Sequence, residues 1–122
     1  MVRVLLVDDE AVFRGSLAQR LRLRGYDVVD RGDGAAAIKA VEEDSRFDVI
    51  ILDNRMPGKN GEEVLREIKR RRRSIPVVML TALGTEQTEG AWACLQKPCE
   101  LDELIRAIED AHKSRLTLES GG

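Results

Sequence analysis

The chain has 122 residues, of which 43% are hydrophobic and 34% are charged, and its formal net charge is -2. This length supports one domain with a single core, and the composition is that of a globular protein rather than a disordered one. The small negative charge provides no general attraction to nucleic acid or to an anionic membrane, and no apolar run approaches the ~20 residues that cross a bilayer.

The N-terminus and the cysteines predict the cellular compartment of the protein. Residues 2–7 enter an apolar run directly, without the basic segment and cleavage site of a signal peptide. Two cysteines, Cys94 and Cys99, are too few for a disulfide framework. We therefore expect a cytoplasmic protein whose cysteines are reduced.

The first part of the chain alternates between strand-like and helix-like patterns. The apolar run over residues 2–7 predicts a strand that ends on Asp8-Asp9-Glu10. Helical spacing then begins at Ala11, with Phe13, Leu17 and Leu21 four residues apart, and Gly25 provides the stop. An edge strand and an Ala-rich helix are predicted next, over residues 26–30 and 35–44.

Residues 47–53 form the most apolar strand of the chain. Five of the seven are apolar and mostly β-branched, and the run stops on the carboxylate of Asp53. Such a run is typical of a strand that is buried on both faces in the middle of a parallel sheet. It would place Asp53 at the carboxyl end of the strand, where open α/β sheets bind their ligands.

The second part of the chain continues the alternation. Gly61 to Ile68 mark a helix, and residues 77–80 form a strand that ends at Thr81. Residues 93–96 form a weak strand that ends before Lys97-Pro98, and a final helix begins near Glu100. The apolar pattern is lost from Lys113 onward. We therefore assign residues 1–113 to the domain and residues 114–122 to a C-terminal tail or linker stub.

Alternating strands and helices predict an α/β fold with three layers, α-β-α, around a doubly wound, parallel, five-stranded sheet. Four strands end near ionisable or hydroxyl residues, whereas the strand over residues 26–30 contributes nothing comparable. That distribution fits the flavodoxin-like strand order 2-1-3-4-5, in which the second strand lies at an edge. Only nine residues, 82–90, lie between Thr81 and Ala91, the residue two before the fifth strand, so we predict a missing or shortened fourth helix.

The residues at the strand ends indicate one kind of chemistry. Three neighbouring carboxylates, Asp8, Asp9 and Asp53, repel one another, and Mg²⁺ removes that repulsion by binding carboxylate oxygens. Lys97 adds a positive charge and Thr81 a hydroxyl donor, which suits a carboxylate that accepts a phosphoryl group. Alone, Asp8-Asp9-Glu10 could simply start a helix, and Thr81 and Lys97 could be structural. Their joint placement at matching strand ends favours a site.

Four motifs occur in order: Asp8-Asp9, Asp53-x-x-Met56-Pro57-Gly58-x-x-Gly61, Thr81-Ala82 and Lys97-Pro98. Through them the chain resembles the receiver domains of two-component response regulators, over roughly residues 2–112. The resemblance implies that Asp53 is the phosphoacceptor, supplied by a sensor histidine kinase or a histidine phosphotransfer protein. It also implies a phosphorylation-controlled switch that catalyses its own phosphorylation and slow autodephosphorylation, rather than an enzyme with a free substrate.

The resemblance implies roles for the other site residues. Mg²⁺, with Mn²⁺ as a substitute, would be held by Asp8, Asp9, Asp53 and the backbone carbonyl of Arg55. Thr81 and Lys97 would contact the phosphoryl oxygens and start the conformational switch. Arg55 and Leu83 occupy the positions that tune autodephosphorylation.

Cys94 stands where the family usually has Tyr or Phe, and Cys99 stands where Phe is common. Because a cysteine cannot supply a large side chain with two positions, we expect the coupling from Thr81 to be absent or rerouted. An alternative is therefore a phosphorylatable docking module with an uncoupled output face. A small Mg²⁺-dependent phosphohydrolase is a further alternative, although Arg55 occupies the slot where a second acid would be needed.

The expected partners follow from the same resemblance. They are the phosphodonor and an unidentified output partner or effector domain, with a second copy in a homodimer as an alternative. No membrane contact is expected. The basic run Lys69 to Arg73 is interpreted as a solvated helix end rather than a nucleic-acid contact. His112 is not interpreted as a phosphodonor or metal ligand.

Overall fold

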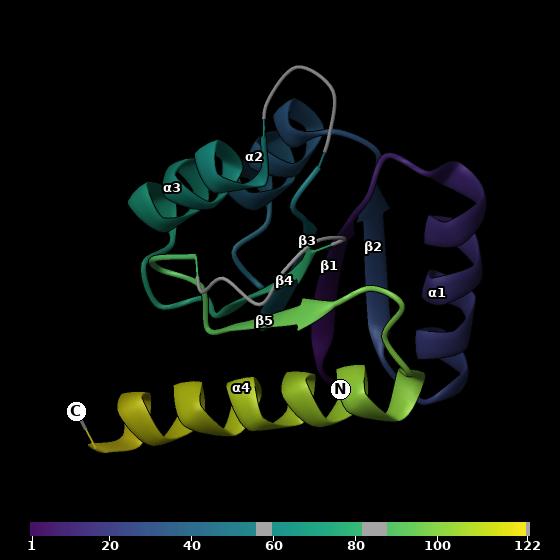
Figure 1. Ribbon diagram of the computed structural model, residues 1–122. Coiled ribbons are helices and arrows are strands. Elements are labelled where there is room, and N and C mark those ends of the chain that lie inside the picture. The colour runs from purple at the N-terminus through teal and green to yellow at the C-terminus, as the bar shows by residue number, and fades with distance from the viewer. Residues whose placement is uncertain (56–59, 82–87, 122) are drawn as a thin grey trace.

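The computed structural model describes residues 1–55, 60–81 and 88–121, with side chains described through residue 116. Its elements, in chain order (Figure 1), are β1 (Arg3–Val7), α1 (Ala11–Leu23), β2 (Asp27–Arg31), α2 (Gly34–Glu43), β3 (Val49–Asp53), α3 (Gly61–Arg71), β4 (Val77–Thr81), β5 (Ala93–Gln96) and α4 (Leu101–Gly121). Among the helices in these residues, none has both the length and the hydropathy of a membrane span.

The five strands form one sheet in the order β2-β1-β3-β4-β5, and every pairing is parallel. Helices α2 and α3 cover one face, and α1 and α4 cover the other (Figure 1). The three-layer, doubly wound fold predicted from the sequence is confirmed, including its strand order.

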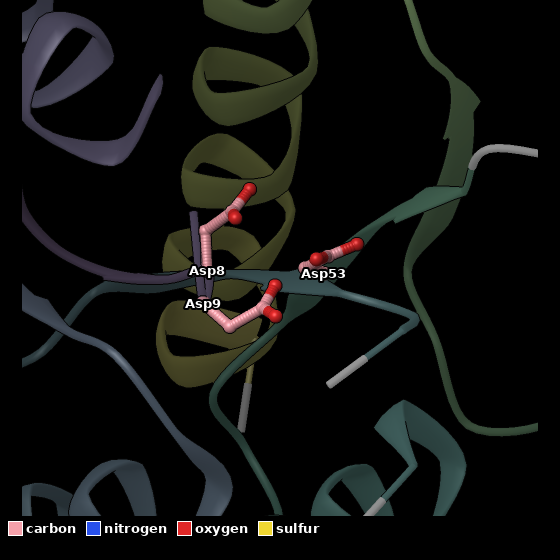
Figure 2. A group of neighbouring side chains, drawn as sticks. All are labelled: Asp8, Asp9 and Asp53. Carbon is pink, nitrogen blue, oxygen red and sulfur yellow. The ribbon is translucent and has the colours of Figure 1, made fainter. Parts of the chain in front are cut away.

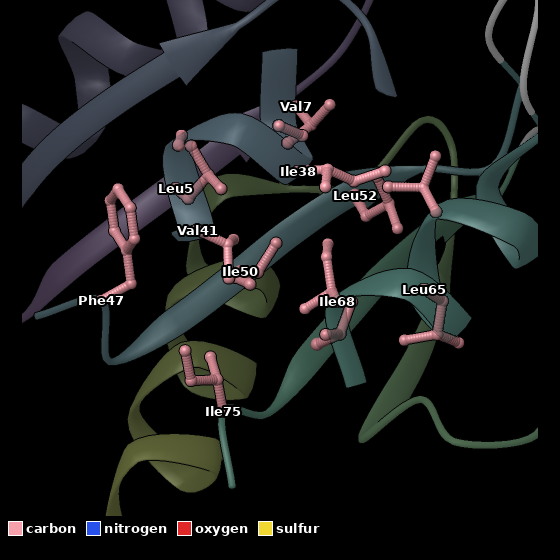
Figure 3. Close-up of a cluster of buried hydrophobic side chains, with 14 of the residues drawn as sticks. Leu5, Val7, Ile38, Val41, Phe47, Ile50, Leu52, Leu65, Ile68 and Ile75 are labelled. Atoms are coloured by element: carbon pink, nitrogen blue, oxygen red, sulfur yellow. The ribbon is translucent and has the colours of Figure 1, made fainter. Parts of the chain in front are cut away.

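Strand β3 is buried on both faces, as its composition predicts. All five of its residues are buried, and alternate side chains enter the two separate cores. Ile50 and Leu52 pack under α2 and α3 with Phe47 (Figure 3), whereas Val49 and Ile51 pack toward α1 and α4. Burying each of these side chains contributes about 1.5–3 kcal/mol, so the strand that carries Asp53 is firmly held.

Side-chain hydrogen bonds stabilise the start of α2 and the segment that follows α3. The side chain of Asp33 accepts a hydrogen bond from the backbone N–H of Ala36 at the start of α2, at 2.7 Å. Lys69, in the last turn of α3, donates to the carbonyls of Arg73 (3.2 Å) and Ile75 (2.7 Å). Lys69 therefore ties down the segment that follows α3, and it is partly buried rather than fully solvated.

Helix α4 is longer than the apolar pattern indicates, because it continues through residues 114–121 to Gly121. The pattern reports burial, whereas each residue added to an existing helix also gains a backbone hydrogen bond. Arg115 still contacts the sheet layer, since its guanidinium donates to the carbonyl of Phe47 at 2.7 Å. Packing against the domain thus extends at least to Arg115, and the proposed boundary at residue 113 remains a prediction.

The sequence predicts that the connection between β4 and β5 has a missing or shortened helix. Residues 82–87, which include Leu83, lie outside the described residues, so that prediction falls largely on a segment not described. The described part, residues 88–92, contains turns and no helix. Its backbone is joined to β5 by the N–H of Thr88, which donates to the sulfur of Cys94 at 3.4 Å.

Candidate functional site

The parallel strands bring the predicted site residues to one edge of the sheet. Asp53, the last residue of β3, lies opposite Leu80 of β4, so Thr81 lies one residue beyond it on the neighbouring strand. Thr81 is buried, and its carbonyl accepts a hydrogen bond from the backbone N–H of Lys97 at 2.7 Å. Asp8 directly follows β1, the strand on the other side of β3.

Three carboxyl groups meet at this edge. One oxygen from each of Asp8, Asp9 and Asp53 lies within 4.8 Å of the others (Figure 2). Asp8 and Asp53 are buried, at 0% and 5% exposed, whereas Asp9 is exposed to solvent. The sequence prediction that these carboxylates gather is therefore confirmed.

The acidic cluster fits a small, hard divalent cation. Two oxygens on opposite sides of a Mg²⁺ ion lie about 4.2 Å apart, because each Mg–O bond is about 2.1 Å long. The separations among the three carboxylates approach that distance, and their oxygens are the ligands that Mg²⁺ prefers. The three carboxylates could therefore hold such an ion.

Lys97 supplies positive charge inside the cluster. Its Nζ donates to Asp8 Oδ2 at 3.0 Å and lies 3.6 Å from Asp53 Oδ1, and the side chain is 20% exposed. Burial of the ammonium lowers the pKa of Lys97, but the hydrogen bond to Asp8 and the nearby carboxylate charges outweigh it, so the pKa is raised overall. The sequence predicted Lys97 at the site without predicting this pairing with Asp8.

The environment of Asp53 disfavours its charged form. Burial is the main cause of its raised pKa, and the charge of Asp8 adds to it, whereas the charge of Lys97 and a hydrogen bond from Arg55 act in the opposite direction. That bond runs from the backbone N–H of Arg55 to Asp53 Oδ1 at 3.3 Å. An added cation would therefore favour the charged form of this carboxylate.

Asp8 also has a structural role. Its Oδ1 accepts a hydrogen bond from the backbone N–H of Glu10 at 2.9 Å, where α1 begins. Glu10 makes no side-chain capping bond of its own. Arg14 donates from Nη1 to the backbone carbonyl of Asp8 at 2.7 Å and from Nε to Asp30 at 2.9 Å. The described residues thus show no side-chain N-cap in α1, and the contacts with Glu10 and Arg14 fix Asp8 just before the helix.

Gly61 approaches the backbone of the site closely. A Cβ at this position would lie 2.7 Å from the Cα of Asn54, 2.9 Å from the carbonyl oxygen of Asp53 and 3.0 Å from Cε of Met79. The N–H of Gly61 also donates to the carbonyl of Asn54 at 2.9 Å. The glycine therefore allows α3 to dock directly beneath the residues that follow Asp53.

Two residues have surroundings that the sequence pattern did not predict. Phe13, spaced with Leu17 and Leu21, is 39% exposed, and the Nζ of Lys97 lies 4.6 Å from the centroid of its ring. Helical spacing could not reveal this contact across 84 positions. Cys94 is partly buried and packs against the core on the α2–α3 face, opposite Met79 in the β4–β5 register.

Comparison with known proteins identifies the class of domain. Residues 4–109 match the model of the response regulator receiver domain. The transcriptional regulatory protein PdtaR of Mycobacterium tuberculosis is 39% identical over 114 residues, which cover 88% of this chain and 55% of that protein. The chain thus spans about half the length of this curated relative.

Solved structures give the same result. A response regulator receiver domain protein from Clostridium thermocellum matches with a TM-score of 0.92 and 28% identity, covering 97% of this chain and 99% of that one. The response regulator TrrA of Thermotoga maritima, crystallised with Mg²⁺-BeF, matches with a TM-score of 0.83 and 30% identity over 91% of this chain and 99% of that one. TrrA has also been crystallised with the histidine kinase ThkA. The chain belongs to the response regulator receiver domain family and is a receiver domain of the two-component type.

Proposed function

We propose that Asp53 accepts a phosphoryl group from a phosphohistidine on a sensor histidine kinase or a histidine phosphotransfer protein. The observation that carries the proposal is the placement of Asp53 beside Asp8, Asp9 and Lys97, with carboxylate oxygens within 4.8 Å and an ammonium 3.0 and 3.6 Å from two of them. A nucleophilic carboxylate with cationic support is the arrangement that phosphoryl transfer requires.

The transfer exchanges one bond to phosphorus for another. A carboxylate oxygen of Asp53 forms the new P–O bond while the P–N bond to the donor imidazole breaks. The electron pair of that bond stays on the imidazole nitrogen, and the histidine leaves without a phosphoryl group. Lys97 lies where it can neutralise charge on the transferred oxygens, and Thr81 is near enough in the sheet to contact them.

Mg²⁺, or Mn²⁺ in its place, would be held by the carboxylates of Asp8, Asp9 and Asp53 and by the backbone carbonyl of Arg55. When bound, the ion supplies positive charge that offsets the crowded carboxylates and the phosphoryl oxygens. The raised pKa of Asp53 supports this part of the proposal, because burial and the charge of Asp8 disfavour the charged form that a cation would stabilise.

The partners are proposed by likeness. TrrA binds the kinase ThkA, and we infer that a kinase or phosphotransfer protein of the same kind serves this domain in the cytoplasm. PdtaR is named as a transcriptional regulatory protein, which favours an output in transcription through an effector segment or partner. The domain then acts as a signalling switch, with slow autodephosphorylation tuned by Arg55 and Leu83.

The test uses beryllofluoride, which mimics a phosphoryl group on a carboxylate, together with Mg²⁺. Binding is followed by the fluorescence of Trp92, which is 43% exposed, and by isothermal titration. We expect binding in wild type and none in Asp53→Asn, which keeps the shape of the side chain and removes its charge. Equal binding by the two proteins would contradict the proposal.

A second candidate function is a phosphorylatable docking module that does not transmit a change to its output face. The observation that favours it is Cys94, which is held by the core and by the N–H of Thr88 and has no large ring to reposition. Amide hydrogen exchange in β4 and β5 with and without beryllofluoride separates the two functions. Protection that changes in both strands supports the switch, and protection unchanged beyond the site supports the docking module.

A further inference from the structure

The ring of Phe13 packs against the ammonium group of Lys97. The Nζ of Lys97 lies 4.6 Å from the ring centroid, well inside the distance of about 6 Å at which a cation is attracted to an aromatic face. The same Nζ is 3.0 Å from Asp8 and 3.6 Å from Asp53. The ammonium is therefore enclosed by two carboxylates and one aromatic ring.

This arrangement limits the freedom of a long side chain. A lysine has four rotatable side-chain bonds, and a lysine at the mouth of an open site would otherwise exchange its contacts for water. Phe13 lies in the first part of α1, just after the loop that Arg14 and Asp8 fix through a 2.7 Å hydrogen bond. The ring is thus carried by a rigid element and can hold the ammonium toward the carboxylates.

We propose that Phe13 is a positioning residue for phosphoryl transfer, whose ring holds the Lys97 ammonium group between Asp8 and Asp53. The proposal rests on the proposed function of Asp53. It assigns to Phe13 an electrostatic task that an aliphatic side chain of similar size cannot perform, since only the ring carries the negative face that attracts a cation.

The competing explanation is ordinary packing. Phe13 also lines a hollow of about 490 Å³ between α1 and α4, whose apolar lining includes Leu17, Leu80 and Leu104. A packing role would be retained by Phe13→Leu, which is apolar and only moderately smaller. An electrostatic role would be lost in Phe13→Leu and retained in Phe13→Tyr, so this pair of variants separates the two.

The first measurement is the affinity for beryllofluoride at saturating Mg²⁺. A cation–π contact at a partly buried site changes an equilibrium by roughly 2- to 30-fold, and we expect Phe13→Leu to weaken binding by about 3- to 10-fold. Phe13→Tyr should remain within about 2-fold of wild type. Phenylalanines with increasing ring fluorination at position 13 should weaken binding step by step, since fluorine depletes the ring face without changing its packing. Equal affinity across wild type, Phe13→Leu and the fluorinated series would overturn the proposal.

A control in a second background makes the result specific. In a Lys97→Met background, Phe13→Leu should cause no further loss, because the cation has been removed. A further loss there of the same size would assign the effect to packing and overturn the proposal.

The second measurement does not depend on phosphoryl chemistry. In the free protein, the ring current of Phe13 should shift the Lys97 Hε protons upfield, and the shift should disappear in Phe13→Leu. An absent ring-current shift in wild type would refute the contact itself. If the shift is present but wild type binds no beryllofluoride, the proposed function of Asp53 fails, and the positioning role fails with it. If wild type binds and Phe13→Leu binds equally well, only the positioning role fails.

Discussion

Replacing Lys97 by methionine removes the positive charge from the acidic cluster while keeping most of the aliphatic stem. Nζ–O separations of 3.0 and 3.6 Å give attractions of roughly 5 kcal/mol each at an effective dielectric constant of about 20. Desolvation of the ammonium offsets several kcal/mol of this, and removal of one partner from a buried ion pair typically costs about 3–5 kcal/mol. Because Lys97 is 20% exposed, we expect Lys97→Met to destabilise the metal-free protein by about 2–4 kcal/mol.

The assay is urea unfolding followed by circular dichroism, with and without saturating Mg²⁺. Lys97 and a bound cation neutralise the same carboxylates, so Mg²⁺ should stabilise Lys97→Met more than wild type, and at least half of the difference between them should vanish. Lys39→Met is a matched control, since Lys39 is 71% exposed and its nearest carboxylate, on Glu43, is 3.9 Å away. An unchanged stability in Lys97→Met, or a difference that Mg²⁺ leaves intact, would refute this account of the electrostatics.

Two further predictions concern the same edge of the sheet. Because the pKa of Asp53 is raised in the folded protein, its carboxylate destabilises the fold above that pKa. Asp53→Asn should therefore stabilise the metal-free protein near neutral pH, and the gain should shrink as pH falls and the wild-type carboxyl becomes protonated. A gain that grows on acidification in a pH series of urea unfolding would have the wrong sign. Gly61→Ala should lower the free energy of unfolding by about 1–3 kcal/mol, because its Cβ would lie 2.7 Å from the Cα of Asn54. The same substitution should also weaken beryllofluoride binding. Gly15→Ala, in α1 with open space around the new Cβ, should be neutral or stabilising in the same assays, and equal effects of the two substitutions would argue against a close approach at Gly61.

The fold could be predicted from the sequence because its strands are chemically distinct. The apolar run before Asp53 requires burial on both faces, and only a central strand of a parallel sheet provides it. Once that strand is central, the polar residues after β1, β4 and β5 must share its carboxyl edge, which is why Asp8 and Lys97 could be placed near Asp53.

The sequence could not predict how these side chains divide their contacts. Whether Lys97 bonds Asp8 or Asp53 depends on rotamers and on distances of a few tenths of an ångström, and the ring that faces it belongs to Phe13 on another element. The end of the final helix could not be read from the sequence for a different reason. Hydrophobic periodicity detects buried faces, and the apolar pattern is lost from Lys113 onward, whereas the helical backbone of α4 continues to Gly121.

The most direct test of the proposed function asks whether Asp53 becomes an aspartyl phosphate. Incubating the protein with acetyl phosphate and Mg²⁺, followed by borohydride reduction, converts an aspartyl phosphate to homoserine, which peptide mass spectrometry locates in the chain. We expect homoserine at position 53 in wild type, a yield that falls when Mg²⁺ is chelated, and no homoserine at this position in Asp53→Asn. Modification at Asp8 or Asp9 instead of Asp53, or no modification in the presence of Mg²⁺, would contradict it.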